Sequence, residues 1–348
     1  MASKNGRVFI KGNEMLKETL TFNDVLMVPQ YSDITSRSQV STSRYLDRKV
    51  WLDLPVISSP MDTVTENKMA TCMSDAGGLG IIHRYNTIEQ QCNTVNMVHG
   101  VKAAAIGMTG DYKERAMALF EAGTRILCVD VAHGHHAMMK VCLEDLKSTF
   151  GDALHVIAGN VATLEAYNDL ADWGADSIRV GIGGGSICST RLVSGHGVPT
   201  LQSVLDCARS DRNVPIIADG GLKTSGDMVK ALAAGADFVM VGSLLAGTSA
   251  TPGEVFKGSD GKRYKVYRGM ASSAAQKDWR GKSSSPEGIS TTVPYKGSTE
   301  NILADLRGGI QSGCSYSGAR NIDELREKCQ FIKQTLAGQN ESFTHILR

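Results

Sequence analysis

One cysteine stands in a setting that could make it a nucleophile. Cys188 lies in a glycine-rich segment, residues 180–191, between hydroxyl side chains and close to Arg191. Glycines lack a Cβ and tolerate positive φ, so the N–H groups of such a segment can converge on an anion. A nearby cation and peptide dipoles stabilise a thiolate. The alternative is a flexible turn beside an inert buried thiol, but the glycines and hydroxyls favour the nucleophile.

The same glycines could belong to a dinucleotide-binding fingerprint. That fingerprint needs the spacing G-x-G-x-x-G and a later acidic residue that holds a ribose. The spacing differs here, and no acidic residue lies between Ile182 and Leu205. We therefore set this interpretation aside.

The composition is that of an ordinary globular protein. The chain has 348 residues, of which 42% are hydrophobic and 21% charged, and its net charge of +1 predicts no bulk attraction to nucleic acid or to an anionic membrane. No apolar run approaches the roughly 20 residues of a membrane span. The eight cysteines form no C-x-x-C pair, and residues 1–14 lack the apolar core of a signal peptide. We expect a cytoplasmic protein without a nucleic-acid or membrane partner.

From Pro55 onward, short β-branched runs alternate with segments of helical length. This alternation is typical of βα units around a parallel sheet. Eight units predict a closed (β/α)8 TIM barrel, and a doubly wound open sheet is the alternative. The predicted strands are Val56–Ser59, Leu79–His83, Ala103–Gly107, Ile126–Val131, His155–Val161, Ser177–Ile182, Pro215–Gly221 and Phe238–Ser243. A glycine that would end a helix in the left-handed conformation precedes every second strand, at Gly77, Gly123, Gly174 and Gly235.

We predict a single catalytic domain over residues 51–348, after an N-terminal extension and irregular segment at residues 1–50. Residues 262–268 alternate like a small strand, and residues 271–297 have the polar composition of a lid. Helices are expected at residues 302–310 and 322–335.

Polar residues and glycines gather at the carboxyl ends of the predicted strands, where a barrel of this kind has its active site. The segments are Ser58–Asp62, His83-Arg84, Asp130 with His133 and His135, Gly159-Asn160, Gly183–Arg191, Asp219–Gly221 and Gly242-Ser243. The last two occupy the usual phosphate position after strands seven and eight. Asp219–Gly221, taken alone, could equally be a tight turn. His133, His135 and His136 could bind zinc, but no carboxylate or cysteine set accompanies them, so we interpret them as solvated loop histidines.

Several of these motifs, together with others along the chain, resemble the IMP dehydrogenase and GMP reductase family. They are residues 21–26, 58–64, 158–161, 183–191, 218–221, 242–243, 267–270 and 295–297, in the family's order. The resemblance implies a homotetrameric barrel that binds a purine monophosphate, GMP or IMP, and a nicotinamide cofactor.

The resemblance also implies a role for each matching residue. Cys188 would attack purine C2, and Thr190 with Glu287 would move a proton, although Glu287 taken alone reads as an exposed lid carboxylate. The 5′-phosphate would be held by Ser186, Gly221, Gly242, Ser243 and Tyr267. The ribose and base would meet Ser59, Met61, Asp219, Gly269, Met270 and Gly288. The cofactor would meet Arg84, Asp130, Asn160 and Arg191, with Arg84 a candidate for the 2′-phosphate of NADPH. A monovalent cation such as K⁺ would bind at Gly183, Gly185 and Cys188, as in the dehydrogenases.

The two activities of the family differ in the second step. A dehydrogenase oxidises IMP with NAD and hydrolyses the Cys188 thioimidate to XMP, whereas a reductase expels ammonia from GMP and uses NADPH. The lid here has Trp279-Arg280-Gly281 and no Arg-Tyr pair like that of the dehydrogenases, and its Ser285–Gly288 resembles the reductases. No tandem regulatory (CBS) domain follows the second strand.

These features favour a GMP reductase, although Pro60 resembles the dehydrogenases and leaves that activity as the alternative. A non-catalytic nucleotide sensor is a third possibility, and the intact Cys188 argues against it.

Overall fold

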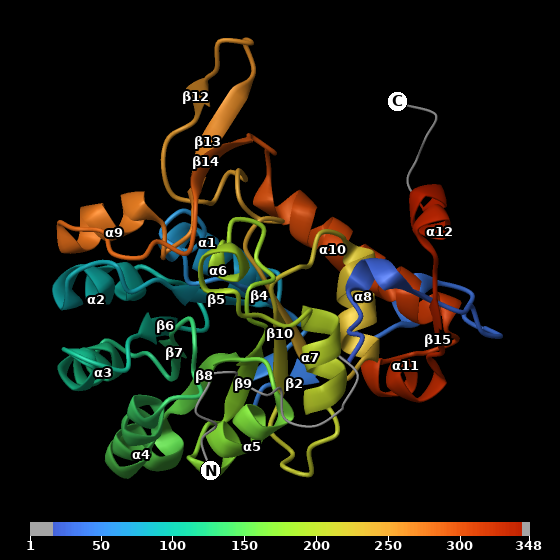
Figure 1. The fold of residues 1–348 in the computed structure, drawn as a ribbon, viewed down its shortest axis with the longest axis horizontal. Coiled ribbons are helices and arrows are strands. Elements are labelled where there is room, and N and C mark those ends of the chain that lie inside the picture. The colour runs from blue at the N-terminus through green and yellow to red at the C-terminus, as the bar shows by residue number, and fades with distance from the viewer. Residues whose placement is uncertain (1–16, 343–348) are drawn as a thin grey trace, which may run out of the picture.

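The computed structural model describes residues 17–342, and its centre is a closed barrel of eight parallel strands (Figure 1). Around the barrel the strands follow the order β10-β11-β4-β5-β6-β7-β8-β9. This confirms the predicted TIM barrel and excludes an open sheet. The strands are β4 (Val56–Ser58), β5 (Leu79–Ile82), β6 (Ala103–Ile106), β7 (Ile126–Asp130), β8 (His155–Val161), β9 (Ser177–Val180), β10 (Ile216–Asp219) and β11 (Phe238–Val241).

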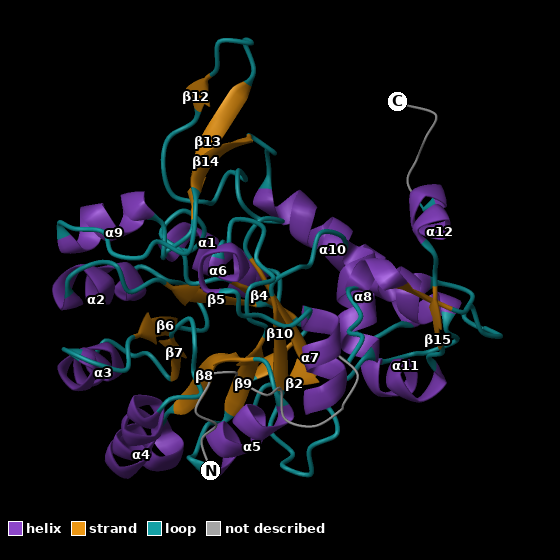
Figure 2. Cartoon of the chain, in the orientation of Figure 1, coloured by secondary structure: helices purple, strands orange, loops and turns teal. Residues whose placement is uncertain are grey.

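Helices cover the outside of the barrel (Figure 2). Those that follow the strands are α1 (Asn67–Asp75), α2 (Ile88–Asn96), α3 (Tyr112–Glu121), α4 (Ala137–Phe150), α5 (Leu164–Asp172), α7 (Thr200–Cys207), α8 (Ser225–Ala233) and α10 (Thr299–Tyr316). Helix α10 packs against both α8 and α1 and so closes the ring. Helix α2 connects β5 to β6.

The barrel strands are apolar on both faces because both faces are buried. Residues such as Ile57, Ile217 and Phe238 fill the interior of the barrel, and residues such as Val56 and Val239 pack against the helices. The predicted helix-ending glycines adopt positive φ, with 75° at Gly77, 93° at Gly123, 102° at Gly174 and 118° at Gly235.

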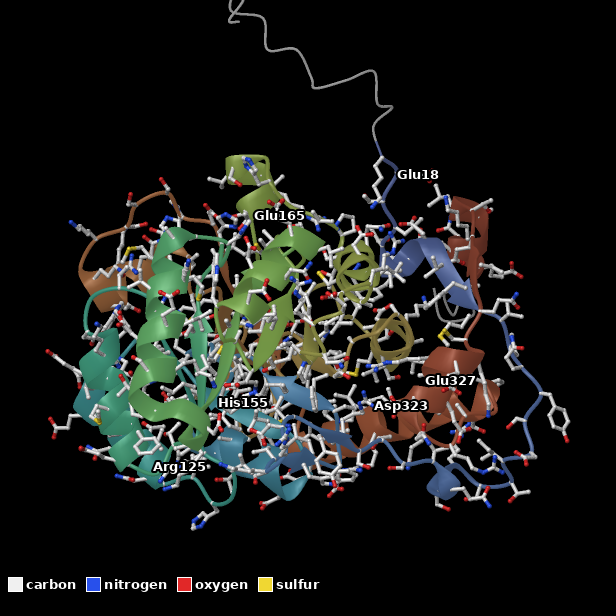
Figure 3. The ribbon with its side chains drawn as sticks, turned by 90° about the horizontal axis from the view of Figure 1, so that it is seen from below. Glu18, Arg125, His155, Glu165, Asp323 and Glu327 are labelled. Carbon is white, nitrogen blue, oxygen red and sulfur yellow. The ribbon has the colours of Figure 1, made fainter. Side chains whose placement is uncertain are left out.

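A short hairpin closes the end of the barrel opposite the strand carboxyl ends. Strands β2 (Arg44–Tyr45) and β3 (Trp51–Leu52) pair antiparallel, and Leu46 and Leu52 join the barrel's interior cluster. Asp47, in the turn of the hairpin, accepts from Nδ1 of His155 on β8 at 2.9 Å. Figure 3 labels His155, beside blue segments from the N-terminal part of the chain. The segment expected to be irregular therefore contributes directly to the barrel core.

The predicted lid and strand form a small sheet that projects from the barrel (Figure 1). Strands β12 (Phe256–Lys257), β13 (Arg263–Arg268) and β14 (Ser290–Pro294) pair antiparallel, and α9 (Ser273–Arg280) lies between β13 and β14 in the chain. The helix predicted over residues 302–310 is longer than expected, since α10 spans Thr299–Tyr316.

The helix predicted over residues 322–335 was partly wrong. Helix α11 (Ile322–Lys328) ends early, and β15 (Phe331–Lys333) pairs antiparallel with β1 (Val25–Met27). The partner strand lies some 300 positions away, so local periodicity could not reveal it. The remaining elements are α6 (Thr190–Ser194), α12 (Leu336–Glu341) and three 3₁₀ turns, Phe22–Asp24, Arg37–Gln39 and Gly151–Ala153. Within residues 17–342, no helix is both long and apolar enough to cross a membrane.

Candidate active site

A cavity of about 400 Å³ opens at the carboxyl ends of the barrel strands. This volume falls in the range of small-molecule sites. The structure brings to it nearly every residue that the sequence singled out. They are Ser59, Met61, Arg84, Asp130, Asn160, Gly183, Gly185, Ser186, Cys188, Thr190, Asp219, Gly221, Gly242, Ser243, Tyr267, Gly269, Met270, Glu287 and Gly288.

Arg191 is the exception among the predicted residues. Its side chain is exposed and packs against Gly183 and Gly197, and its guanidinium donates to the carbonyl of Val198 at 2.9 Å. The structure therefore places Arg191 on the outer side of the Cys188 loop.

The lid binds the Cys188 loop through its backbone. Ser189 N–H donates to the carbonyl of Glu287 at 2.9 Å, and Ile289 N–H donates to the carbonyl of Ile187 at 3.0 Å. On its other side the same lid segment accepts the Gly269 N–H at the Ile289 carbonyl, also at 3.0 Å. These bonds hold the lid residues 287–289 as a short extended strand between the cysteine loop and the residues after β13.

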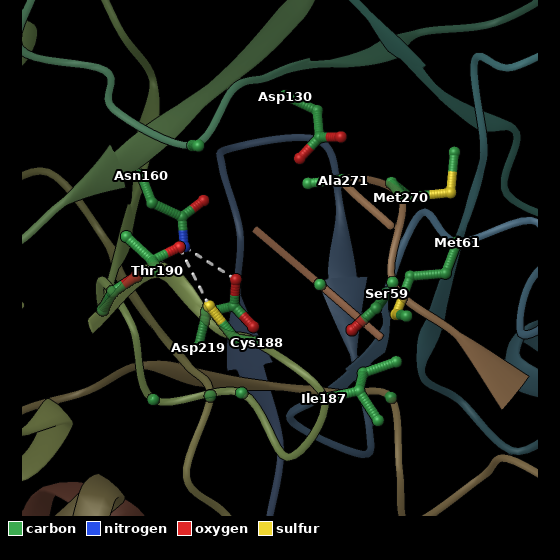
Figure 4. A pocket seen from close by; sticks show the side chains of 18 of the residues that line it. Ser59, Met61, Asp130, Asn160, Ile187, Cys188, Thr190, Asp219, Met270 and Ala271 are labelled. Atoms are coloured by element: carbon green, nitrogen blue, oxygen red, sulfur yellow. Dashed lines mark hydrogen bonds between the residues drawn. The ribbon is translucent and has the colours of Figure 1, made fainter. Parts of the chain in front are cut away.

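This pairing brings three reactive side chains, those of Cys188, Thr190 and Glu287, into line. Figure 4 shows the first two, with Thr190 beside the sulfur of Cys188. Cys188 Sγ lies 3.1 Å from Thr190 Oγ1, and Thr190 Oγ1 donates to Glu287 Oε2 at 2.8 Å. All three side chains are half-buried at the cavity wall. A thiol, a hydroxyl and a carboxylate in this order can pass a proton from the sulfur to the carboxylate and back.

A buried arginine organises the floor of the cavity. Arg179 on β9 donates to Asp130 Oδ1 at 2.5 Å and to Asp219 Oδ2 at 2.8 Å. Asn160 Nδ2 donates to the same Asp219 oxygen at 2.8 Å, as Figure 4 shows. Burial opposes the charge, but the carboxylates of Asp219 and Asp130 raise the pKa of Arg179 well above its usual value. Sequence reasoning missed Arg179, although a charged residue inside an apolar strand is itself a signal of a buried ion pair.

The loop after β9 and the loop after β10 approach each other closely, and this contact explains why both contain glycines. A Cβ on Gly181 would lie 2.0 Å from the carbonyl oxygen of Asp219, and Gly220 adopts φ of 88° while it faces the backbone of Gly184 and Gly185. Only glycine permits this contact. The predicted tight turn at Asp219–Gly221 is thus also part of the cavity wall.

One end of the cavity has uncharged hydrogen-bond donors that could hold an anion. The hydroxyls of Tyr267 and Ser186 lie 3.5 Å apart, and a Cβ on Gly242 would lie 3.1 Å from the Tyr267 hydroxyl. Burial raises the pKa of Tyr267, so the phenol stays protonated and can donate. Together with backbone N–H groups at Gly221 and Ser243, these hydroxyls can surround a phosphate.

The loop that carries Gly269 and Met270 is anchored by Arg268. Its Nε and Nη2 donate to Asp62 Oδ2 at 3.0 and 2.6 Å, and Asp278 on α9 accepts from Nη1. Asp62 N–H in turn lies 3.3 Å from Met270 Sδ. Among these partners the side chain of Arg268 is only 20% exposed.

Comparison with known proteins shows the family of this chain. A sequence model described as the IMP dehydrogenase / GMP reductase domain matches residues 19–345. The chain belongs to this family. An IMP dehydrogenase from Cryptosporidium parvum is 38% identical over 96% of each chain, and a GMP reductase from Leishmania major is 33% identical over 95% of this chain and 97% of its own.

A solved structure gives the same answer for the fold. A GMP reductase variant from Trypanosoma brucei, crystallised with guanosine 5′-monophosphate, has 32% sequence identity and a TM-score of 0.89, and the match covers 95% of this chain and 98% of that one. Family membership makes the chain an oxidoreductase. Relatives named IMP dehydrogenase and relatives named GMP reductase are about equally similar to this chain. Family membership therefore does not distinguish the two activities, and the distinction has to come from the residues of the site.

The remaining predictions concern metals. Within residues 17–342, no three His, Cys, Asp or Glu residues are placed to hold a metal ion. His135 pairs with Asp169 at 2.7 Å, and His136 caps α4 by accepting from Met138 N–H. In the loop expected to bind a monovalent cation, the carbonyl of Gly185 accepts from Cys188 N–H at 3.2 Å. The cation remains a prediction.

Proposed function

We propose that this protein is a GMP reductase, which converts GMP to IMP and ammonia with NADPH through a covalent thioimidate at Cys188. The observation that carries the proposal is Thr190, which lies between the thiol and Glu287. Of the two reactions of the family, only the reductase reaction expels ammonia, and this step needs an acid that protonates the leaving amino group. A proton path from Cys188 to a lid carboxylate therefore supports the reductase.

The geometry supports a proton that moves from Cys188 to Glu287 and later from Glu287 to the substrate. Cys188 passes its proton through Thr190 to Glu287, and the thiolate then attacks C2 of GMP to form a C–S bond. Glu287 returns the proton through Thr190 to the amino group, so that the C2–N bond breaks, ammonia leaves and the thioimidate remains. The reduced nicotinamide, when bound, supplies a hydride to C2. Cleavage of the C–S bond then releases IMP and leaves Cys188 as a thiolate, which takes up a proton from solvent before the next cycle.

Other residues hold the two ligands. Asp219 is positioned by Arg179 and Asn160 to accept from ribose hydroxyls, and Tyr267 with Ser186 lies where a 5′-phosphate needs donors. For the cofactor, Arg84 lines the cavity beside Asp130, with Nε 3.2 Å from the Asp130 carbonyl, and its positive charge supports a cofactor that carries phosphate. A cytoplasmic homotetramer and a K⁺ requirement belong to the same proposal.

The second candidate is an IMP dehydrogenase that lacks the regulatory domain. Pro60, in the loop after β4, favours it, as do relatives that carry this name. The composition of the lid argues against the dehydrogenase. That reaction needs a group that activates water, and residues 271–297 contain no Arg-Tyr pair like that of the dehydrogenases.

Two assays separate the candidates. The purified chain is mixed with GMP and NADPH and, separately, with IMP and NAD, with and without K⁺, and the absorbance of the reduced nicotinamide is followed. Oxidation of NADPH that depends on GMP supports the reductase. Reduction of NAD that depends on IMP overturns it. Cys188→Ala serves as the control and should abolish either reaction.

A further inference from the structure

The buried amide of Gln276 joins three parts of the lid. Gln276 lies on α9, is 7% exposed and lines the cavity. Its Oε1 accepts from the N–H of Ser284 at 2.9 Å, and its Nε2 donates to the carbonyl of Ala271 at 3.0 Å. The same Ala271 carbonyl accepts from the N–H of Glu287 at 3.1 Å. One side chain therefore links the start of the lid, the loop after α9 and, through the shared carbonyl, the backbone of Glu287.

Helix α9 gives this amide a fixed base. Trp279 stacks on Tyr85, in the segment after β5, with ring centroids 6.0 Å apart and planes 18° apart. Figure 1 shows α9 beside α2, the helix that follows Tyr85. Asp278 accepts from Arg268 at the end of β13. Two residues of the last turn of α9 are thus tied to other elements, so the position of Gln276 does not depend on the loop that follows the helix.

The loop that leads from α9 to Glu287 depends on this amide. Residues 282–286 are mostly exposed, and within residues 17–342 the only hydrogen bond that they form is the one from Ser284 to Gln276. Ser285 has φ of 43°, which is unfavourable for a residue with a Cβ and more so before a proline. Such a conformation persists only where its surroundings impose it. The hydrogen bonds of the Ser284 and Glu287 N–H groups flank Ser285 on both sides and can impose it.

We propose that Gln276 is a positioning residue for Glu287. By holding Ser284 and Ala271, its amide maintains the strained turn and keeps the Glu287 carboxylate 2.8 Å from the hydroxyl of Thr190. Gln276 acts on no reacting atom, and its effect reaches the reaction through Glu287. The proposal rests on the proposed function, since it takes Glu287 as the proton carrier.

Removing the amide should lower turnover and spare binding. Gln276→Leu in the full chain keeps a helix-forming side chain of similar size but loses both hydrogen bonds, so kcat with GMP and NADPH should fall about tenfold or more. The affinity for GMP, measured by calorimetry, should stay within about threefold. Gln276→Glu keeps the acceptor for the Ser284 N–H and should retain more of kcat. Unchanged turnover in Gln276→Leu would overturn the proposal. A loss that appears only in the affinity for GMP or NADPH would make Gln276 a ligand contact and would also overturn it.

A double-mutant cycle tests whether the effect passes through Glu287. With Glu287→Gln already present, adding Gln276→Leu should lower kcat by less than about twofold, because no carboxylate is left to position. A residue that only stabilises the fold would cause the same loss in both backgrounds. Equal losses would therefore overturn the proposal.

Gln202 provides the matched control. It lies on α7, is also 7% exposed, and its Oε1 accepts from the N–H of Leu20 at 3.4 Å, but it lies outside the cavity. Gln202→Leu should leave kcat unchanged. A loss as large as that in Gln276→Leu would show a general effect of removing a buried amide and would overturn the specific role of Gln276.

Amide hydrogen exchange separates this proposal from the proposed function, because it needs no turnover. In Gln276→Leu, the peptide that covers residues 282–289 should exchange about tenfold faster than in the parent, and Gln202→Leu should leave its exchange unchanged. Unchanged exchange in Gln276→Leu would show that the amide does not hold the lid and would overturn the proposal. If the parent shows no GMP-dependent oxidation of NADPH but Gln276→Leu exchanges faster there, the reductase assignment falls and the placement of Glu287 by Gln276 stands.

Discussion

Thr190 donates a 2.8 Å hydrogen bond to Glu287, although 97 positions separate the two residues in the chain. Thr190 is the first residue of α6, which follows the cysteine loop after β9, and Glu287 belongs to the lid. The backbone bonds between residues 187–189 and the lid fix this relationship. The proton path from Cys188 is therefore complete only when the lid is seated on the cysteine loop.

Replacing the lid carboxylate should slow deamination without preventing attack. Glu287→Gln keeps the size of the side chain but cannot take up a proton, so GMP-dependent oxidation of NADPH should fall by about 10²- to 10⁴-fold. Steady-state absorbance measures the loss. Binding of GMP, followed by calorimetry, should change little because Glu287 is half-buried at the wall and its backbone bonds remain.

A glutamate outside the cavity provides the control for Glu287→Gln. Glu254 is exposed and lies outside the cavity, so Glu254→Gln should keep full activity. Thr190→Val breaks both links of the path and should lose at least as much activity as Glu287→Gln. Normal turnover in Glu287→Gln would remove the carboxylate from the mechanism.

Alkylation should single out Cys188 among the cysteines. Its half-buried thiol opens into the cavity. Burial raises the pKa of four other thiols to about 12, so that almost none is a thiolate at pH 7.5, and these are Cys128, Cys142, Cys207 and Cys314. Peptide mass spectrometry after brief iodoacetamide treatment should find Cys188 modified first and protected by GMP. Faster labelling of any buried thiol would contradict this account.

The sequence predicts most of the fold and of the site because both depend on local rules. Runs such as Ile126–Val129 are apolar on both faces, as is typical of a parallel strand that is covered on both sides. Parallel strands end at one edge, so residues after them, such as Cys188 and Asp219, had to meet there. The lid residue that acts with them, Glu287, was predicted from the resemblance to the family and not from local rules.

Interactions between distant segments were the part that sequence could not supply. Arg179 binds Asp130 and Asp219, which lie 49 and 40 positions away, and the residues on either side of it, Ile178 and Val180, are apolar. The stack of Tyr85 on Trp279 likewise joins segments far apart in the chain. Neither contact has a periodicity that a sequence can show.

Arg268 should be a stabilising and positioning residue for the base loop. Arg268→Ala would leave the carboxylate of Asp62, 12% exposed, without its partner, and should lower the free energy of unfolding by about 2–4 kcal/mol. Because Met270 contacts the Asp62 N–H, the KM for GMP should rise as well. Urea unfolding and initial rates measure the two effects.

The two carboxylate partners of Arg268 allow an internal comparison. Asp278 is 65% exposed, so Asp278→Ala should cost at most about 0.5 kcal/mol. Arg268→Lys keeps one charge but not the fork, and should recover part of the stability. If Asp278→Ala destabilises the chain as much as Arg268→Ala, then Arg268 stabilises the fold through its contact with α9 and not through Asp62 in the loop after β4.

Acid should weaken the closed end of the barrel through Asp47. The hydrogen bond from His155 lowers the pKa of Asp47 from 3.8 to about 2, with help from the N–H groups of Lys49 and Val50 and against the effect of burial. A carboxyl whose pKa is lower in the folded state stabilises the fold above pH 4 and loses that contribution as the pH falls from about 4 to 2. With screening by solvent, the contribution is about 1–2 kcal/mol.

Asp47→Asn removes the charge and nearly preserves the shape. The variant should be about 1–2 kcal/mol less stable than the parent at pH 7, and the difference should vanish near pH 2. Urea unfolding between pH 2 and 7 measures it, with the exposed Asp152→Asn at the same end of the barrel as control. A difference that stays constant with pH would mean that Asp47 acts through its hydrogen-bonding shape alone. Since the hairpin that carries Asp47 also places Leu46 in the barrel interior, a difference that depends on pH would make the hairpin part of the cooperative unit that holds the active site together.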